Sequence, residues 1–298
     1  MLQRLPGGEY CLPEDEKRMI SQDVTISVDG SQMPAYLARP EENSGAHPAV
    51  IVLQEVFGFT PEVKRVTDLL ASTGYVGLAI DYYHRGHARF SAPYTEEGNK
   101  NAFEAAAGVT AESAIADVSA AISWLNEQSF VRFGNIATWG FGFGATLAFV
   151  SASLRELSGA ICFYPGNIAT AMPSGGEPPI ERAEDVSVPL LLAFGEKDYY
   201  VSRFDMDRVY TSLKQAGKDF RMQIYPNVGH SFFRHGSPAA IAEQQRYSDE
   251  SVAQAVADSW DLVRKFLKDC FATSARRAAE TGEIHTAHTQ PLQSRTRR

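Results

Sequence analysis

The pattern of apolar and polar positions divides the chain into a short alternating region and a longer region of buried segments. Residues 24–28 alternate apolar and polar side chains, as in a strand with one exposed face. The dipeptide Asp29-Gly30 favours a turn, and residues 33–37 form a second apolar-rich segment. We therefore predict an antiparallel hairpin near the N-terminus.

From residue 49 onward, short continuous apolar runs alternate with segments of helical periodicity. Runs such as AVIVL at 49–53 are typical of strands buried on both faces of a parallel sheet. The predicted strands are 49–53, 76–80, 136–139, 159–163, 189–194 and 220–225, and the predicted helices are 63–73, 96–107, 110–128, 144–153, 203–216 and 251–271. This alternation predicts an α/β protein with a mostly parallel, doubly wound sheet and an N-terminal antiparallel hairpin.

The two ends of the chain differ from this pattern. We predict an irregular lead-in at 1–22, one α/β domain at 23–271 and a disordered tail at 272–298. The tail has no aromatic residue, little apolar content and five arginines, which is typical of a segment that cannot bury a core. A total of 298 residues is long for one ordinary domain but normal for one large open sheet with helices on both faces.

Composition limits the kinds of molecule that the protein is expected to bind. The formal net charge of −8 lacks the basic footprint of a nucleic-acid-binding protein. No apolar run reaches membrane-spanning length, and the N-terminus does not resemble a signal peptide. We therefore expect a cytoplasmic protein with a small-molecule substrate or ligand and neither a nucleic-acid nor a membrane partner. The pattern carries no oligomerisation signature, which favours a monomer.

Cysteine and histidine usage argues against a metal centre. Cys11, Cys162 and Cys270 are odd in number and widely spaced, unlike a disulfide framework or a zinc cluster. His84 and His87 are close together, but no third ligand follows nearby. We expect neither a metal nor another cofactor.

Candidate chemistry begins at a glycine-rich turn, TWGFGFGA at residues 138–145. A strand that passes through such a turn into a helix is the context of a nucleophile elbow, G-x-nucleophile-x-G. Gly140 and Gly144 then take the two positions that require a small residue, and the nucleophile position is Gly142. The same turn loosely matches a dinucleotide-binding loop, with Ala145 in its last position. The turn by itself does not decide between the two.

Two later segments favour the elbow. Asp198 follows the predicted strand 189–194, and His230 lies in the loop after the strand 220–225. Elbow, acid and base in this order are typical of the α/β-hydrolase fold. A dinucleotide-binding fold would instead place an acidic residue at the end of the strand after the glycines, where this chain has FYPG. We therefore predict Asp198 as the catalytic acid and His230 as the base.

The segment VLQEVFG at 52–58 adds a candidate oxyanion hole. It follows the first parallel strand, so its backbone lies at the same edge of the sheet as the elbow. We predict that the backbone N–H groups of Val56 and Phe143 donate to the developing oxyanion of a substrate.

Together these motifs resemble the dienelactone hydrolases, also called carboxymethylenebutenolidases, over roughly residues 24–270. The segments that carry the resemblance are QEVFG at 54–58, DYYHR at 81–85, the elbow at 140–145, GEKD at 195–198 and GHSFFR at 229–234. The resemblance implies hydrolysis of a small carboxylate-bearing lactone or ester. It also implies that Glu55 assists the nucleophile, and that Arg85 and Arg234 bind the substrate carboxylate.

The departure from the family is at the nucleophile, which is a cysteine in the family and Gly142 here. Cys162 lies in a predicted buried strand and is expected to be core, and Ser231 is expected to be structural. Covalent catalysis through residue 142 is therefore excluded.

Three interpretations remain open. In the first, His230 and Asp198, alone or with Glu55, activate water directly. In the second, the protein is a catalytically inactive pseudoenzyme that binds a small carboxylate through Arg85 and Arg234. In the third, the chain is a nucleophile-deleted variant of an active hydrolase.

Overall fold

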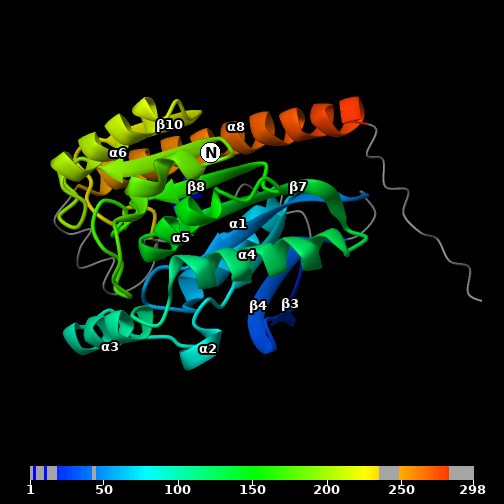
Figure 1. The fold of residues 1–298 in the computed structure, drawn as a ribbon, viewed down its shortest axis with the longest axis horizontal. Coiled ribbons are helices and arrows are strands. Elements are labelled where there is room, and N and C mark those ends of the chain that lie inside the picture. The colour runs from blue at the N-terminus through cyan, green and yellow to red at the C-terminus, as the bar shows by residue number, and fades with distance from the viewer. Residues whose placement is uncertain (1–2, 5–9, 12–18, 42–44, 235–247, 282–298) are drawn as a thin grey trace, which may run out of the picture.

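One eight-stranded sheet forms the centre of the computed structural model, which describes residues 3–4, 10–11, 19–41, 45–234 and 248–281 (Figure 1). The strand order is β10-β9-β8-β7-β5-β6-β4-β3. The strands are β3 (Met19–Val28), β4 (Ser31–Pro40), β5 (His47–Leu53), β6 (Val76–Ile80), β7 (Val131–Phe141), β8 (Gly159–Phe163), β9 (Leu190–Gly195) and β10 (Phe220–Tyr225). Pairing is parallel from β6 through β10 and antiparallel at β4, which confirms the predicted fold class.

The predicted hairpin is present but longer than predicted. Strands β3 and β4 pair over ten positions, and the turn closes where Val28 faces Ser31. Asp29 and Gly30 both have positive φ, at 48° and 79°, as a two-residue hairpin turn requires. The hairpin joins the main sheet because β4 pairs with β6.

Two predicted boundaries differ from the structure. The lead-in is not wholly irregular, because β3 starts at Met19 and the short strands β1 (Gln3–Arg4) and β2 (Tyr10–Cys11) pair with each other. The tail does not begin at residue 272, because α8 (Asp249–Thr281) continues past it. The rest of both segments lies outside the described residues.

Helices cover both faces of the sheet (Figure 1). The apolar run of β5 alternates between two cores. Ala49, Ile51 and Leu53 pack with α4 (Ala111–Asn126), α5 (Phe143–Ser151) and α6 (Arg203–Gln215). The alternate residues Val50 and Val52 pack with α1 (Pro61–Ser72) and α8. This two-sided burial explains why the strand is continuously apolar.

Local sequence determines where two of these helices begin. Thr110 and Ser113 form a reciprocal capping box at the start of α4, and Ser202 and Asp205 form one at the start of α6. Each pair satisfies backbone N–H groups that lack partners within the helix. Within the described chain, no single helix is long and apolar enough to cross a membrane.

Shorter helices lie in two of the connections between strands. The segment after β6 holds α2 (His84–His87) and α3 (Glu96–Ala106), which lie at the lower end of the molecule in Figure 1. A 3₁₀ helix, η1 (Pro179–Asp185), lies between β8 and β9. Only α3 was predicted, because α2 and η1 are too short to show a helical period.

Candidate active site

The candidate residues lie after strands that end at one edge of the sheet. Glu55 follows β5, Gly142 follows β7, Asp198 follows β9 and His230 follows β10. The chain leaves β5 toward β6 on one side, while β7 and the later strands lie on the other side. Ligands of open α/β sheets bind at such a reversal, at the carboxyl ends of the strands.

The glycine-rich turn has the geometry of a nucleophile elbow. Gly142 stands between β7 and α5 with φ 53° and ψ −119°. A Cβ at Gly140 would lie 2.1 Å from the carbonyl oxygen of Gly144, and one at Gly144 would lie 2.2 Å from that of Gln54. Both flanking positions therefore require glycine, as the motif predicts.

The nucleophile position itself has room for a side chain. A Cβ at Gly142 would lie 3.6 Å from Cγ of Glu55 and 3.8 Å from Nε2 of His230, which are ordinary van der Waals distances. A side chain at this position would therefore point between the candidate base and Glu55.

The elbow supports a stability prediction. Gly144→Ala is expected to destabilise the fold by about 3 kcal/mol or more, because its methyl group overlaps the backbone of β5 and the residue after it. Gly86→Ala is the matched control, since its Cβ would meet nothing within 4 Å. Urea denaturation measures both, and equal stability of the two variants would contradict the tight packing of the elbow.

The predicted base and acid are hydrogen-bonded. Nδ1 of His230 lies 2.9 Å from Oδ2 of Asp198. The other oxygen, Oδ1, accepts from the backbone N–H groups of Tyr200 at 2.8 Å and Val201 at 2.9 Å, so the buried carboxylate is held in place. An ionised carboxylate only accepts, so Nδ1 carries the proton and Nε2 has its lone pair toward residue 142.

The two predicted oxyanion donors face one pocket. Val56 and Phe143 both line a pocket of about 390 Å³ together with Gly142 and His230. Phe143 is the first residue of α5, so its N–H has no partner within the helix. The N–H of Phe143 is therefore available to a carbonyl oxygen beside Gly142, and the predicted donor Val56 lines the same pocket.

Two tyrosines that we did not assign a positioning role hold the turn that carries Val56. The hydroxyl of Tyr82 donates to the carbonyl oxygens of Gln54, at 2.9 Å, and Glu55, at 3.0 Å. The hydroxyl of Tyr83 donates to the carbonyl oxygen of Val56 at 2.8 Å. Both are buried. The tyrosine pair within DYYHR was the available signal, although its partners cannot be read from spacing.

Arg234 lies in the pocket but is engaged by Glu55. The two side chains form an ion pair, and they are 7% and 14% exposed. The guanidinium also donates to Oγ of Ser231 at 2.8 Å and lies 4.2 Å from the ring centre of Tyr94. Burial is the largest single effect and lowers the pKa of Arg234, but the charge and hydrogen bond of Glu55, together with Tyr94 and Tyr164, outweigh it, so the net pKa lies above the ordinary value.

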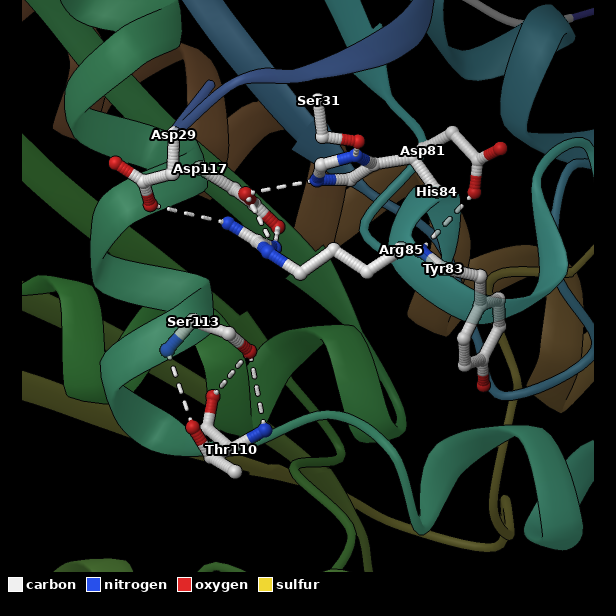
Figure 2. Close-up of polar contacts among 9 residues, drawn as sticks. All are labelled: Asp29, Ser31, Asp81, Tyr83, His84, Arg85, Thr110, Ser113 and Asp117. Carbon is white, nitrogen blue, oxygen red and sulfur yellow. Dashed lines mark hydrogen bonds and ion pairs between the residues drawn. The ribbon is translucent and has the colours of Figure 1, made fainter.

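Arg85 lies outside the pocket, whereas the family resemblance implies that Arg85 and Arg234 bind the same substrate carboxylate. Its guanidinium binds both carboxylate oxygens of Asp117, at 2.8 and 3.0 Å, and reaches Asp29 at 3.5 Å (Figure 2). Arg85 is not among the described residues that line the pocket. Its neighbour His84 is bound between Ser31 and Asp117, so this end of DYYHR connects the hairpin to α4.

Cys162 and Cys270 do not replace the missing nucleophile. Cys162 lies in β8, fully buried in the core, and burial raises the pKa of its thiol. Burial likewise raises the pKa of Cys270 to about 12. A buried thiol with a raised pKa is a poor nucleophile. Within the described residues, no group of three or more His, Cys, Asp or Glu residues could hold a metal ion.

The outer part of the pocket comes from segments that we did not predict to reach it. Tyr94 and Phe103 belong to the region around α3, and Tyr199 and Tyr200 belong to the loop between β9 and α6. The exposed pair Tyr199-Tyr200 directly after Asp198 was a usable signal, because loops at this edge of the sheet surround the ligand.

The fold, the elbow and the order of elbow, acid and base define an α/β hydrolase. The sequence model of the dienelactone hydrolase family matches residues 33–271. The chain therefore belongs to the dienelactone hydrolase family, whose members are hydrolases of esters and lactones.

Curated relatives agree with this assignment, and a solved structure has the same fold. A Synechocystis protein named "Putative carboxymethylenebutenolidase" is 29% identical over 245 residues, which cover 82% of this chain and 95% of that protein. A Bradyrhizobium protein named "Probable 2-oxo-3-(5-oxofuran-2-ylidene)propanoate lactonase" is 28% identical, covering 76% and 90%. The crystal structure titled "Putative Dienelactone Hydrolase", from Klebsiella pneumoniae, has a TM-score of 0.72 at 23% identity, covering 84% and 99%.

Proposed function

We propose that this protein hydrolyses an ester or lactone without a covalent intermediate, by activating a water molecule at Gly142. One observation carries the proposal: Nε2 of His230 lies 3.8 Å from the point where a Cβ of residue 142 would stand, while Nδ1 is held by Asp198 at 2.9 Å. The base is thus oriented toward a space without a side chain.

The size of that space supports water as the nucleophile. A missing thiol-bearing side chain leaves room for about one water molecule, whose share of the volume of liquid water is roughly 30 Å³. A water there is within reach of His230 and beside the oxyanion donors of Val56 and Phe143. Glu55 flanks the same position and adds a second acceptor for the protons of the water.

The proposed reaction has two steps. His230 takes a proton from water at Nε2 while the water oxygen bonds to the carbonyl carbon, and the carbonyl oxygen becomes an oxyanion held by the two N–H groups. The tetrahedral intermediate then expels the alcohol oxygen, which receives the proton from His230. A triad site without its nucleophile retains about a thousandfold or more of catalysis over water in a well-studied protease.

His230→Ala tests the proposal with phenyl acetate as the probe. We expect the rate above the uncatalysed background to fall by about a hundredfold or more, since general-base catalysis contributes about that much. His87→Ala, an exposed histidine of α2, is the control and is expected to keep the rate of the parent. The readout is phenol release, corrected for background.

An unchanged rate in His230→Ala would contradict the proposal. A parent chain without any hydrolysis above background, but with a ligand bound in the pocket, would support the pseudoenzyme interpretation instead.

A further inference from the structure

The charges around the pocket do not favour an anionic ligand. Three of the described residues that line it carry a formal charge: Glu55, Glu96 and Arg234. Arg234 is neutralised by the ion pair with Glu55, so Glu96 leaves the group with a net charge of −1. A substrate carboxylate would compete with Glu55 for Arg234 and would also face the charge of Glu96.

Arg85 does not change this balance. It is bound by Asp117 and Asp29 on the side of α4 and the hairpin (Figure 2). The two-arginine carboxylate site that the family resemblance implies is therefore not assembled among the described residues.

Aromatic rings from two parts of the chain line the pocket. Phe57, Tyr94 and Phe103 come from the segments after β5 and around α3, and the rings of Phe57 and Tyr94 are 4.5 Å apart. Tyr199 and Tyr200 come from the loop after β9 and are 61% and 46% exposed. Large exposed aromatic side chains that gather at a pocket are typical of a binding surface.

These rings connect the mouth of the pocket to the catalytic base. The rings of Phe103 and Tyr200 are nearly parallel, with an angle of 12° and centres 6.4 Å apart. The ring of Tyr200 lies 5.1 Å from the imidazole of His230. An aryl group that stacks on Tyr200 or Phe103 would therefore place its ester carbon close to His230 and Gly142.

We infer that the pocket selects an uncharged aromatic ester over a carboxylate-bearing one, with Tyr200 and Phe103 recognising the ring and Glu96 disfavouring negative charge. This inference rests on the proposed function only in taking the ligand to be an ester that is hydrolysed. The preference for an uncharged aromatic ligand follows from the charges and rings of the pocket alone. An offset-stacked or edge-to-face ring pair strengthens binding by roughly two- to tenfold beyond its buried area.

The test measures binding of three amides, which replace the ester and remain intact during the measurement. The probes are N-benzylacetamide, its saturated analogue N-(cyclohexylmethyl)acetamide and its charged analogue N-(4-carboxybenzyl)acetamide. Isothermal titration calorimetry with the full chain gives each Kd. We expect the benzyl amide to bind roughly two- to tenfold more tightly than the cyclohexylmethyl amide, and the carboxylate to bind more weakly than both. Equal binding of ring and saturated ring, or tighter binding of the carboxylate, overturns the inference.

Matched variants assign the preference to residues. Tyr200→Leu and Phe103→Leu are each expected to remove the difference between the benzyl and cyclohexylmethyl amides. Phe204→Leu is the control, because Phe204 is 77% exposed in the neighbouring helix and is not among the lining residues. Loss of the difference in Phe204→Leu but not in the other two variants overturns the assignment.

The charge is tested on α3. Glu96→Gln is expected to strengthen binding of N-(4-carboxybenzyl)acetamide by about two- to fivefold, as an exposed charge pair allows. Glu97→Gln is the control, since Glu97 is exposed on the same turn but does not line the pocket. Equal effects in both variants would contradict the role of Glu96. All these readouts are binding constants. If the chain has no hydrolytic activity, the proposed function is wrong, but the binding measurements still test this inference.

Discussion

Gly142→Cys is expected to raise kcat for phenyl acetate by about a thousandfold or more, since removal of a triad nucleophile costs about a millionfold in a well-studied protease. The new side chain would start 3.8 Å from Nε2 of His230, so the base can take the thiol proton. The oxyanion donors and Asp198 need not move. Steady-state kinetics, with mass spectrometry of an acetylated enzyme, measure the gain and its covalent origin.

Gly142→Ala is the matched control for this gain. Its methyl group fits at the same distances, but it supplies no nucleophile and displaces the proposed water. We expect Gly142→Ala to be less active than the parent. Because φ is 53° at this residue, both variants are expected to lose about 1–3 kcal/mol of stability, which thermal unfolding would show. A Gly142→Cys variant that folds and remains as slow as Gly142→Ala would contradict the placement of the elbow.

Arg234→Met is expected to destabilise the folded state by about 3–5 kcal/mol, because it leaves the carboxylate of Glu55 buried without its counter-charge. The Arg234 and Glu55 side chains are only 7% and 14% exposed, so solvent screens the charge only weakly. Methionine retains much of the apolar contact that the arginine side chain makes. Urea denaturation at neutral pH measures the loss.

Two controls separate the effect of the unpaired Glu55 charge from a general loss of packing. One is a variant of an exposed ion pair, and the other is a double variant. Arg264→Met breaks the exposed pair with Asp261 and is expected to cost less than about 1 kcal/mol. Adding Glu55→Gln to Arg234→Met removes the stranded charge and is expected to recover a large part of the stability. Equal losses in Arg234→Met and Arg264→Met would contradict the buried pair.

Most strands were predictable because burial on both faces leaves a continuous apolar run. Strands β6 and β8 match their predicted bounds, since each is a run of five residues that is buried throughout. Strand β7 starts five residues earlier than predicted, at Val131 instead of Ile136, because its first residues are partly exposed and carry no such run. Helix α8 passes residue 271 for a related reason, since residues 272–276 are exposed or half-buried and carry no apolar stripe.

The sequence by itself determined the sheet class, the elbow and the loss of the nucleophile at Gly142, because each depends on neighbouring residues or on the order of strands. Only the tertiary structure showed which charged side chains reach the pocket and with which partners they pair. Arg85 turns toward Asp117, 32 positions away, and Arg234 meets Glu55, 179 positions away. Such partners depend on how helices and loops pack, which local periodicity does not encode. The same packing brings the rings of Tyr199 and Tyr200 to His230, and the ring of Phe103 in α3 to Tyr200.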